Sequence, residues 1–356
     1  MEVSTQLDDK AFVVRNDPKE MYRLTVEFPD QCAKAISIAE AAPLKDLPRN
    51  PNLVCLSGLG GSAAGGDFVR AMFEESGTVP YFVNRDYVMP SYIGPDTLVI
   101  ACSYSGNTEE TLAAYAEAKA KGAMIVAVTS GGKLATQAAA DGFDVIQIPG
   151  GQPPRTALGF LLMPVVVLLS RYGLLPTQDM DALVAHLRKG VAEWSVEVGF
   201  DQNPTKQLAA KLQGKVSVIY GLGSWPALVG NRWKGQINEN AKNMTFANVF
   251  PELNHNEILG WVQADAQGVD QWIGILLQDG TESAKLKKRF EVTARLVAGV
   301  CSFETVTATG STLLEKMVSL ALYGDFVSLY LAALNDVDPE NIDSINILKD
   351  ELSRVP

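Results

Sequence analysis

The sequence has few of the residues that most often hold metals or cross-link chains. It contains two histidines and four cysteines in 356 residues. The cysteines are widely spaced and include no Cys-x-x-Cys pair, which argues against zinc modules and disulfide-stapled domains. Cys55 and Cys102 lie inside apolar runs, where we expect buried free thiols. The other two cysteines are Cys32 and Cys301.

A long apolar run and an excess of positive charge are also missing. The longest apolar stretch, residues 157–170, is interrupted by Gly159 and Pro164. A membrane span needs about 20 apolar residues, so we expect this stretch to be a buried core helix. The polar start shows no secretory signal, which predicts a cytoplasmic protein without membrane contact. The net charge of −11 argues against nucleic acid, although backbone N–H groups and hydroxyls can still hold a small anion.

Short apolar runs alternate with helical patterns through the first half of the chain. This alternation predicts βαβ units and a parallel sheet with helices on both faces, an α/β fold. The predicted strands of the first half are residues 53–57, 79–84, 97–103, 124–129 and 143–148. A helical segment precedes them at 18–42. Helices at 155–171 and 180–198 follow them.

The second half repeats the pattern of the first. Residues 53–62 read as a strand followed by Gly58-Leu-Gly60 and Ser62, and residues 216–224 read as a strand followed by Gly221-Leu-Gly223 and Ser224. The length, at roughly 150 residues per domain, also suggests two domains. Further strands are predicted at 245–248, 268–278 and 298–307, with a long helix at 313–335. The predicted parts are a helical segment (1–45), a first domain (46–152), connecting helices (153–200), a second domain (201–335) and a tail (336–356).

The glycine-rich turn at 58–66 runs from a strand directly into a helix. Glycines let the backbone approach a ligand, and free N–H groups at a helix start favour an anion. Two alternatives stay open at this point. The turn can be purely structural, or Gly58, Gly60 and Ala63 can be a dinucleotide fingerprint with Asp86 as the ribose-binding acid.

The next turn favours a phosphate over a dinucleotide. Ser103-Tyr-Ser105-Gly-Asn107-Thr108 follows the strand at 97–103 and begins a helix. Three hydroxyls and a glycine at a helix start can hold one phosphate, and a dinucleotide fold does not need them. An ordinary N-cap by Asn107 or Thr108 would explain only one of these polar residues.

These motifs resemble a known family. Gly60-Gly61-Ser62 together with Ser103-x-Ser105-Gly-Asn-Thr108 is similar to the phosphosugar-binding SIS fold, and implies two SIS-type domains. The segments 238–242 (Asn-Glu-Asn-Ala-Lys), 251–257 (Pro-Glu-Leu-Asn-His-Asn-Glu) and 154–159 resemble the bifunctional phosphoglucose/phosphomannose isomerases. The resemblance implies interconversion of fructose 6-phosphate with glucose 6-phosphate and mannose 6-phosphate through a cis-enediolate. It assigns the substrate phosphate to Gly61, Ser62, Ser103, Ser105 and Thr108.

The resemblance also implies the catalytic residues and a partner. One carboxylate can move a proton between C1 and C2, and Glu239 is the candidate. An unperturbed imidazole has a pKa of about 6.5, so it can donate and accept protons near neutral pH. His255 is the candidate for ring opening and would come from the neighbouring subunit of a homodimer. Arg155 would steady the enediolate oxygen, and Lys349 would assist ring opening. His186 is expected to face solvent. No metal or other cofactor is implied, which disfavours a zinc-dependent cupin isomerase.

Other functions stay open at this point. A glucose-6-phosphate isomerase without mannose activity would carry the same motifs, because the residue that tunes specificity cannot be aligned across 341–346. A non-catalytic SIS sugar-phosphate sensor would keep the phosphate turns, although no basic recognition helix is visible. A ketose–amine isomerase would need a different C-terminal tail. A nicotinamide-dependent dehydrogenase is the most distant alternative.

Overall fold

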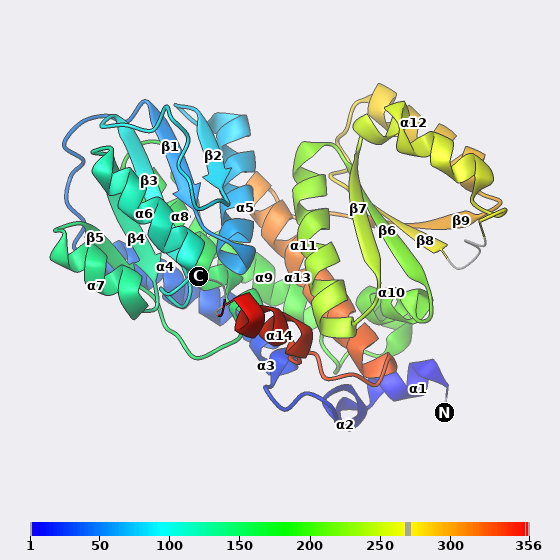
Figure 1. Cartoon of the computed structure of the whole chain (residues 1–356). Coiled ribbons are helices and arrows are strands. Elements are labelled where there is room, and N and C mark those ends of the chain that lie inside the picture. The colour runs from blue at the N-terminus through cyan, green and yellow to red at the C-terminus, as the bar shows by residue number, and fades with distance from the viewer. Residues whose placement is uncertain (1, 268–271, 353, 355–356) are drawn as a thin grey trace. The chain divides into compact units, whose positions relative to one another are not determined.

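The computed structural model describes residues 2–267, 272–352 and 354, which form two compact units (Figure 1). The five-stranded unit comprises Glu27–Arg188 and Thr312–Glu315. The four-stranded unit comprises Met1–Val26, Lys189–Ser311 and Lys316–Pro356. These units interleave along the chain and are defined by contacts, so the domain boundaries taken from the sequence remain a prediction.

The five-stranded unit is built on a wholly parallel sheet in the order β2-β1-β3-β4-β5. Every residue of β3 and β4 is buried, as expected for strands covered on both faces. Helices α4, α5 and α8 cover one face, and α6 and α7 cover the other (Figure 1). The strands are β1 (Leu53–Ser57), β2 (Tyr81–Asn84), β3 (Thr97–Ser103), β4 (Met124–Thr129) and β5 (Asp144–Gln147). The helices are α4 (Phe28–Ala41), α5 (Gly60–Ser76), α6 (Glu109–Ala120), α7 (Gly132–Ala140) and α8 (Leu158–Arg171), preceded by the 3-10 turn η1 (Pro154–Thr156).

The apolar stretch at 157–170 is a buried core helix, as predicted. It forms α8, in which eleven residues are buried, Pro164 among them. Helix α8 packs against α4 and α5. A Cβ on Gly65 of α5 would lie 3.4 Å from the backbone of Leu161, so these two helices approach each other closely.

The four-stranded unit repeats the same topology, with a parallel sheet in the order β7-β6-β8-β9. Both sheets place their first strand second in the order, with a Gly-Leu-Gly segment leading into a helix, so the predicted duplication of one α/β fold is confirmed. The second strand extends further than predicted, because β6 includes Gly221 and Leu222. Helix α12 packs on Val218, Tyr220 and Leu222 of β6, and α11 covers the other face. The strands are β6 (Val216–Leu222), β7 (Thr245–Phe250), β8 (Trp272–Gln278) and β9 (Cys301–Thr307), and the helices are α11 (Ser224–Ala241) and α12 (Ala284–Val297). Residues 268–271 of the predicted strand 268–278 lie outside the described residues.

The remaining helices include one long apolar element, α13 (Leu313–Leu334). It is the single described helix whose length and composition would allow a membrane span, but 94% of its apolar window is buried inside the protein, as in a core helix. The other elements are α1 (Val3–Asp8), α2 (Lys10–Val13), α3 (Met21–Val26), α9 (Met180–Trp194), η2 (Phe200–Gln202), α10 (Pro204–Leu212), η3 (Glu252–His255), η4 (Glu257–Gln263) and α14 (Asp343–Leu352). Part of the predicted C-terminal tail is therefore helical.

Candidate active site

The first part of the candidate site lies at the carboxyl ends of β1, β3 and β4. In an open parallel sheet, ligands bind beyond the carboxyl ends, where the strand order reverses. This reversal falls at β1, which is flanked by β2 and β3. The turns that follow β1 and β3 are the two turns selected from the sequence.

The β3–α6 turn is organised by its own hydroxyls. Ser103 Oγ accepts a hydrogen bond from the N–H of Gly106 (3.1 Å) and lies 2.9 Å from Thr108 Oγ1. Ser105 Oγ accepts from the N–H of Asn107 (3.2 Å). Thr108 is the N-cap of α6, yet its side chain makes no capping bond. The hydroxyls therefore shape the turn rather than cap the helix, which disfavours the simple N-cap interpretation.

Ser62 joins this turn to the glycine-rich turn after β1. Its Oγ accepts from the N–H of Tyr104 at 3.2 Å, and the residue is 6% exposed. Gly61 brings in a third segment, because a Cβ at Gly61 would lie 2.8 Å from the carbonyl oxygen of Pro154 and 3.8 Å from Arg155 Cα. The structure thus brings Gly61, Ser62, Ser103, Ser105, Thr108 and the buried Arg155 together in the five-stranded unit. We call these six residues the cradle.

Residues outside the predicted set of ligands brace the cradle. The first turn of α7 donates from Lys133 N–H to Asn107 Oδ1 (3.1 Å) and from Leu134 N–H to the Gly106 carbonyl (2.9 Å). Ser130 Oγ donates to the Tyr104 carbonyl at 2.6 Å. The only signal in the sequence is Ser130-Gly131-Gly132 directly after a buried strand, a pattern typical of many strand-to-helix turns.

The other predicted residues belong to the four-stranded unit. Glu239 is half-buried in the last turn of α11. His255 is exposed at the end of η3. Lys349 falls within α14, and its side chain lies outside the described part of the chain. In the five-stranded unit, His186 lies on α9 and is half-buried, so it is partly exposed to solvent.

A polar network fixes the segment that follows His255. Glu257 accepts hydrogen bonds from Tyr220 Oη and from Asn248 Nδ2 (2.5 Å), and Trp261 Nε1 donates to Tyr220 Oη (3.0 Å). Burial, and then the neighbouring Glu257 carboxylate, raise the pKa of Tyr220 above its ordinary value. Tyr220 is therefore a neutral donor at physiological pH. No pattern in the sequence signals this network, because its members come from three separate elements.

The thiols are structural. All four cysteines are buried and free, which confirms the expectation for Cys55 and Cys102. Burial raises the pKa of each of these two thiols to about 12, so neither is a nucleophile near neutral pH. Within residues 2–267, 272–352 and 354, no group of three or more His, Cys, Asp or Glu side chains is placed to hold a metal ion.

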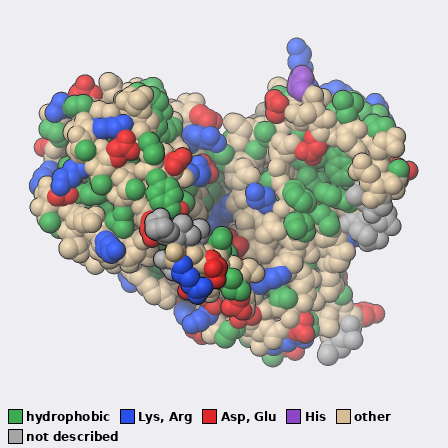
Figure 2. Space-filling view, viewed as in Figure 1, with side chains coloured by type: hydrophobic (Ala, Val, Ile, Leu, Met, Phe, Trp, Pro, Cys, Tyr) green, Lys and Arg blue, Asp and Glu red, His purple; other side chains and the backbone are tan. Residues whose placement is uncertain are grey.

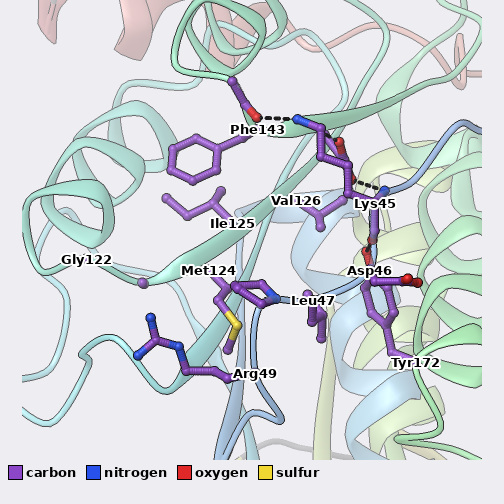
Figure 3. A pocket seen from close by; sticks show the side chains of 14 residues that line it. Lys45, Asp46, Leu47, Arg49, Gly122, Met124, Ile125, Val126, Phe143 and Tyr172 are labelled. Atoms are coloured by element: carbon purple, nitrogen blue, oxygen red, sulfur yellow. Dashed lines mark hydrogen bonds and ion pairs between the residues drawn. The ribbon is translucent and has the colours of Figure 1, made fainter.

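A separate pocket lies at the amino ends of β4 and β5, the edge of the sheet opposite the cradle (Figure 3). Lys45 donates from Nζ to the Gly142 carbonyl (2.8 Å) and from its backbone N–H to Asp144 Oδ2 (2.7 Å). Met124 and Phe143 contribute apolar surface. Lys45 is paired with Asp144 and Gly142, and Arg49 is paired with Asp96 (3.3 Å), so the two cationic side chains that line this pocket already have partners among the residues that the structure describes.

Comparison with known proteins identifies the family. The model of the bacterial phospho-glucose isomerase C-terminal SIS domain matches residues 201–352, and the SIS domain model matches residues 49–153. A bifunctional phosphoglucose/phosphomannose isomerase of Caldicellulosiruptor bescii is 40% identical over 94% of this chain and 99% of its own length. The chain belongs to the bifunctional phosphoglucose/phosphomannose isomerase family. It is thus an isomerase with two SIS-type domains, as the resemblance implied.

Another member of the family agrees with this placement, and a solved structure agrees with the fold. The bifunctional phosphoglucose/phosphomannose isomerase of Thermoplasma acidophilum is 36% identical over 84% of this chain and 89% of its own length. A hypothetical protein of Thermus thermophilus superposes with a TM-score of 0.74, covering 99% of this chain and 94% of its own. Its 18% sequence identity supports the fold alone.

Proposed function

We propose that this isomerase interconverts fructose 6-phosphate with glucose 6-phosphate and mannose 6-phosphate. The observation that carries the proposal is the cradle, in which Ser62, Ser103, Ser105 and Thr108 lie around the amino end of α6. Hydroxyls and helix N–H groups are suitable donors to a dianionic phosphate, and the helix dipole favours negative charge there. The activity named for the relatives supports the choice of sugar.

We assign the proton transfer to Glu239. Its carboxylate removes the proton from C2 of the aldose, or from C1 of the ketose, and leaves a cis-enediolate. The same group, now protonated, returns the proton to the other carbon while the hydroxyl proton passes between O2 and O1, so no redox partner and no metal is required. Both aldoses give one enediolate with a planar C2, and rotation about C2–C3 lets one base reach either face.

Three further residues have proposed roles. His255 passes protons between the ring oxygen and a sugar hydroxyl during ring opening, because a neutral imidazole can both donate and accept. Arg155 stabilises the enediolate oxygen as negative charge develops on it. Lys349 assists ring opening. The enzyme is proposed to work without a cofactor and in the cytoplasm.

We also propose a homodimer in which His255 of the partner subunit completes each site. Leu259 and Val262, each 71% exposed, follow His255 closely in the chain. Met244 and Phe246, 59% and 48% exposed, lie at the edge strand β7, and Figure 2 shows hydrophobic side chains gathered over that strand. Large exposed apolar patches mark interaction surfaces, and a second copy of this chain is the occupant that the role of His255 requires.

The test is a coupled assay of glucose 6-phosphate formation from fructose 6-phosphate, repeated with mannose 6-phosphate. Glu239→Gln should abolish turnover of both sugars with folding intact. Glu291→Gln, on the exposed side of α12, is the matched control and should keep wild-type rates. Turnover of glucose 6-phosphate alone would restrict the proposal to a single-specificity enzyme. A rise in melting temperature with either sugar, but no turnover, would indicate a sugar-phosphate sensor.

A further inference from the structure

The two asparagines that flank Glu239 are both anchored by their side chains. Asn238 donates from Nδ2 to the Thr245 carbonyl (2.9 Å) and accepts from the Thr245 N–H (3.3 Å), which ties it to β7. Asn240 donates from Nδ2 to Ser328 Oγ (2.9 Å) on α13, and is 1% exposed. Glu239 therefore sits between one residue fixed to the sheet and one fixed to a core helix.

The contact between Asn240 and Ser328 ends a longer row of buried polar bonds. Arg232, Gln236 and Asn240 are four residues apart and share one face of α11. Asp325 accepts from Arg232 Nη2 (2.7 Å) and from Gln236 Nε2 (2.8 Å), and Ser328 Oγ donates to the Asp325 carbonyl (2.7 Å). We call these five residues the α11–α13 seam.

The carboxyl end of α11 is held as well. Lys242, in the left-handed conformation with φ of 50°, donates from Nζ to the Glu239 carbonyl (2.7 Å) and to the Asp338 carbonyl (2.6 Å). Asn335 Nδ2 donates to the Ala241 carbonyl at 2.9 Å. The backbone carbonyl of Glu239 thus accepts from Lys242, and that of Ala241 accepts from Asn335, which directly follows α13.

A buried polar row is a costly way to stabilise a helix contact. Well-packed apolar side chains of similar volume usually stabilise such a contact as well or better, and the best-attested use of buried polar pairs is to fix one register. A slip of α11 by one residue along α13 would leave Asp325 and Ser328 without their partners. The directional bonds therefore define one axial position and one rotation of α11.

We infer that the α11–α13 seam, through Asn240 and Ser328, positions the Glu239 carboxylate for proton transfer. Asn240 and Ser328 are positioning residues, since neither is proposed to touch the substrate. This inference rests on the proposed function, in which Glu239 is the base. Because a misplacement of about 1 Å can cost a hundredfold in rate, small shifts of α11 should be visible in turnover.

The experiment compares Ser328→Ala, which removes the hydroxyl that accepts from Asn240 Nδ2, with Thr205→Val. The control removes another fully buried hydroxyl, which bonds Asn203 Oδ1 at 2.6 Å on α10 in the same unit. Both variants should lose a few degrees of melting temperature, on the order of 2–4 °C. We expect kcat for fructose 6-phosphate to fall about tenfold or more in Ser328→Ala with KM unchanged, and to stay near wild type in Thr205→Val. Ser328→Thr, which keeps the hydroxyl, should restore kcat.

The outcomes separate this inference from the proposed function. If wild-type protein turns over the sugar but Ser328→Ala keeps its kcat, the positioning role is wrong and the proposed function stands. Equal falls of kcat in Ser328→Ala and Thr205→Val would assign the loss to general destabilisation and overturn the inference. A wild-type protein without turnover would overturn both.

Discussion

Gly106 is the position at which one methyl group should disturb the cradle most. Its φ is +68°, and a Cβ there would lie 1.8 Å from the Gly131 carbonyl oxygen. The left-handed conformation costs an alanine about 1–2 kcal/mol, and overpacking adds about 1–3 kcal/mol. We expect Gly106→Ala to lower the free energy of unfolding by about 2–5 kcal/mol.

The geometry of the turn should change together with stability. The Gly131 carbonyl oxygen must retreat from 1.8 Å to at least the 3.0 Å that real Cβ contacts respect. Gly106 also donates to Ser103 Oγ and accepts from the Leu134 N–H, so the retreat strains the bonds that shape the cradle. We therefore expect weaker phosphate binding in addition to lower stability.

The assay measures thermal unfolding with and without fructose 6-phosphate, and KM in the coupled assay. Gly94→Ala is the matched control, because a methyl group there would meet nothing within 4 Å beyond its chain neighbours, and the φ of Gly94 is ordinary. At about 2–4 °C for each kcal/mol, Gly106→Ala should unfold roughly 4–20 °C lower than wild type and show a smaller shift with the sugar. If Gly106→Ala matches Gly94→Ala in both melting temperature and KM, the geometry assigned to the cradle is wrong.

Two further predictions concern stability in the five-stranded unit. Leu161→Ala, in a fully buried position of α8, should cost about 2–5 kcal/mol in a urea titration, and a cost below about 1 kcal/mol would contradict the tight packing of α8. Lys119 Nζ at 2.5 Å, and then Tyr115 Oη at 2.6 Å, hold the pKa of Asp141 below its usual range. A carboxyl group whose pKa is lower in the folded state than in the unfolded state stabilises the protein at pH values above its unfolded pKa of about 3.9. That stabilisation is lost as the pH falls through the pKa of the folded state. Asp141→Asn should therefore lower the urea midpoint at pH 7, with a gap to wild type that narrows as the pH falls below about 3.9, whereas a gap independent of pH would refute this assignment.

The sequence was most informative where burial is complete. The predicted bounds of β1, β3 and β4 coincide with those observed, because a strand covered on both faces is a continuous apolar run that ends where the polar turn begins. The ends of the edge strands were predicted less accurately. Strand β2 begins at Tyr81 instead of residue 79, and β9 begins at Cys301 instead of residue 298, since edge strands carry a weaker hydrophobic signal.

The cradle could be predicted because its parts are local in the chain. Each turn combines a buried strand, glycines and hydroxyls within about ten residues, which is a pattern that one sequence can show. The supports of the site could not be predicted in this way. Ser328 meets Asn240 across 88 residues, and Lys133 meets Asn107 across 26. Such contacts depend on how elements pack, and no local pattern specifies them.

The duplicated fold places one turn after β3 and an equivalent turn after β8, and phosphate binding is expected only at the turn after β3. Strand β8 holds the same place in its sheet as β3, and the turn that follows it contains Asp279, Gly280 and Glu282 instead of the serines after β3. The Glu282 carboxylate accepts from the N–H groups of Asp279 (2.5 Å) and Gly280 (3.0 Å). Those N–H groups are therefore already bonded to a negative charge that would repel a phosphate. In the turn after β3, neutral hydroxyls take the place of the carboxylate, so an incoming phosphate meets hydrogen-bond donors and no internal negative charge.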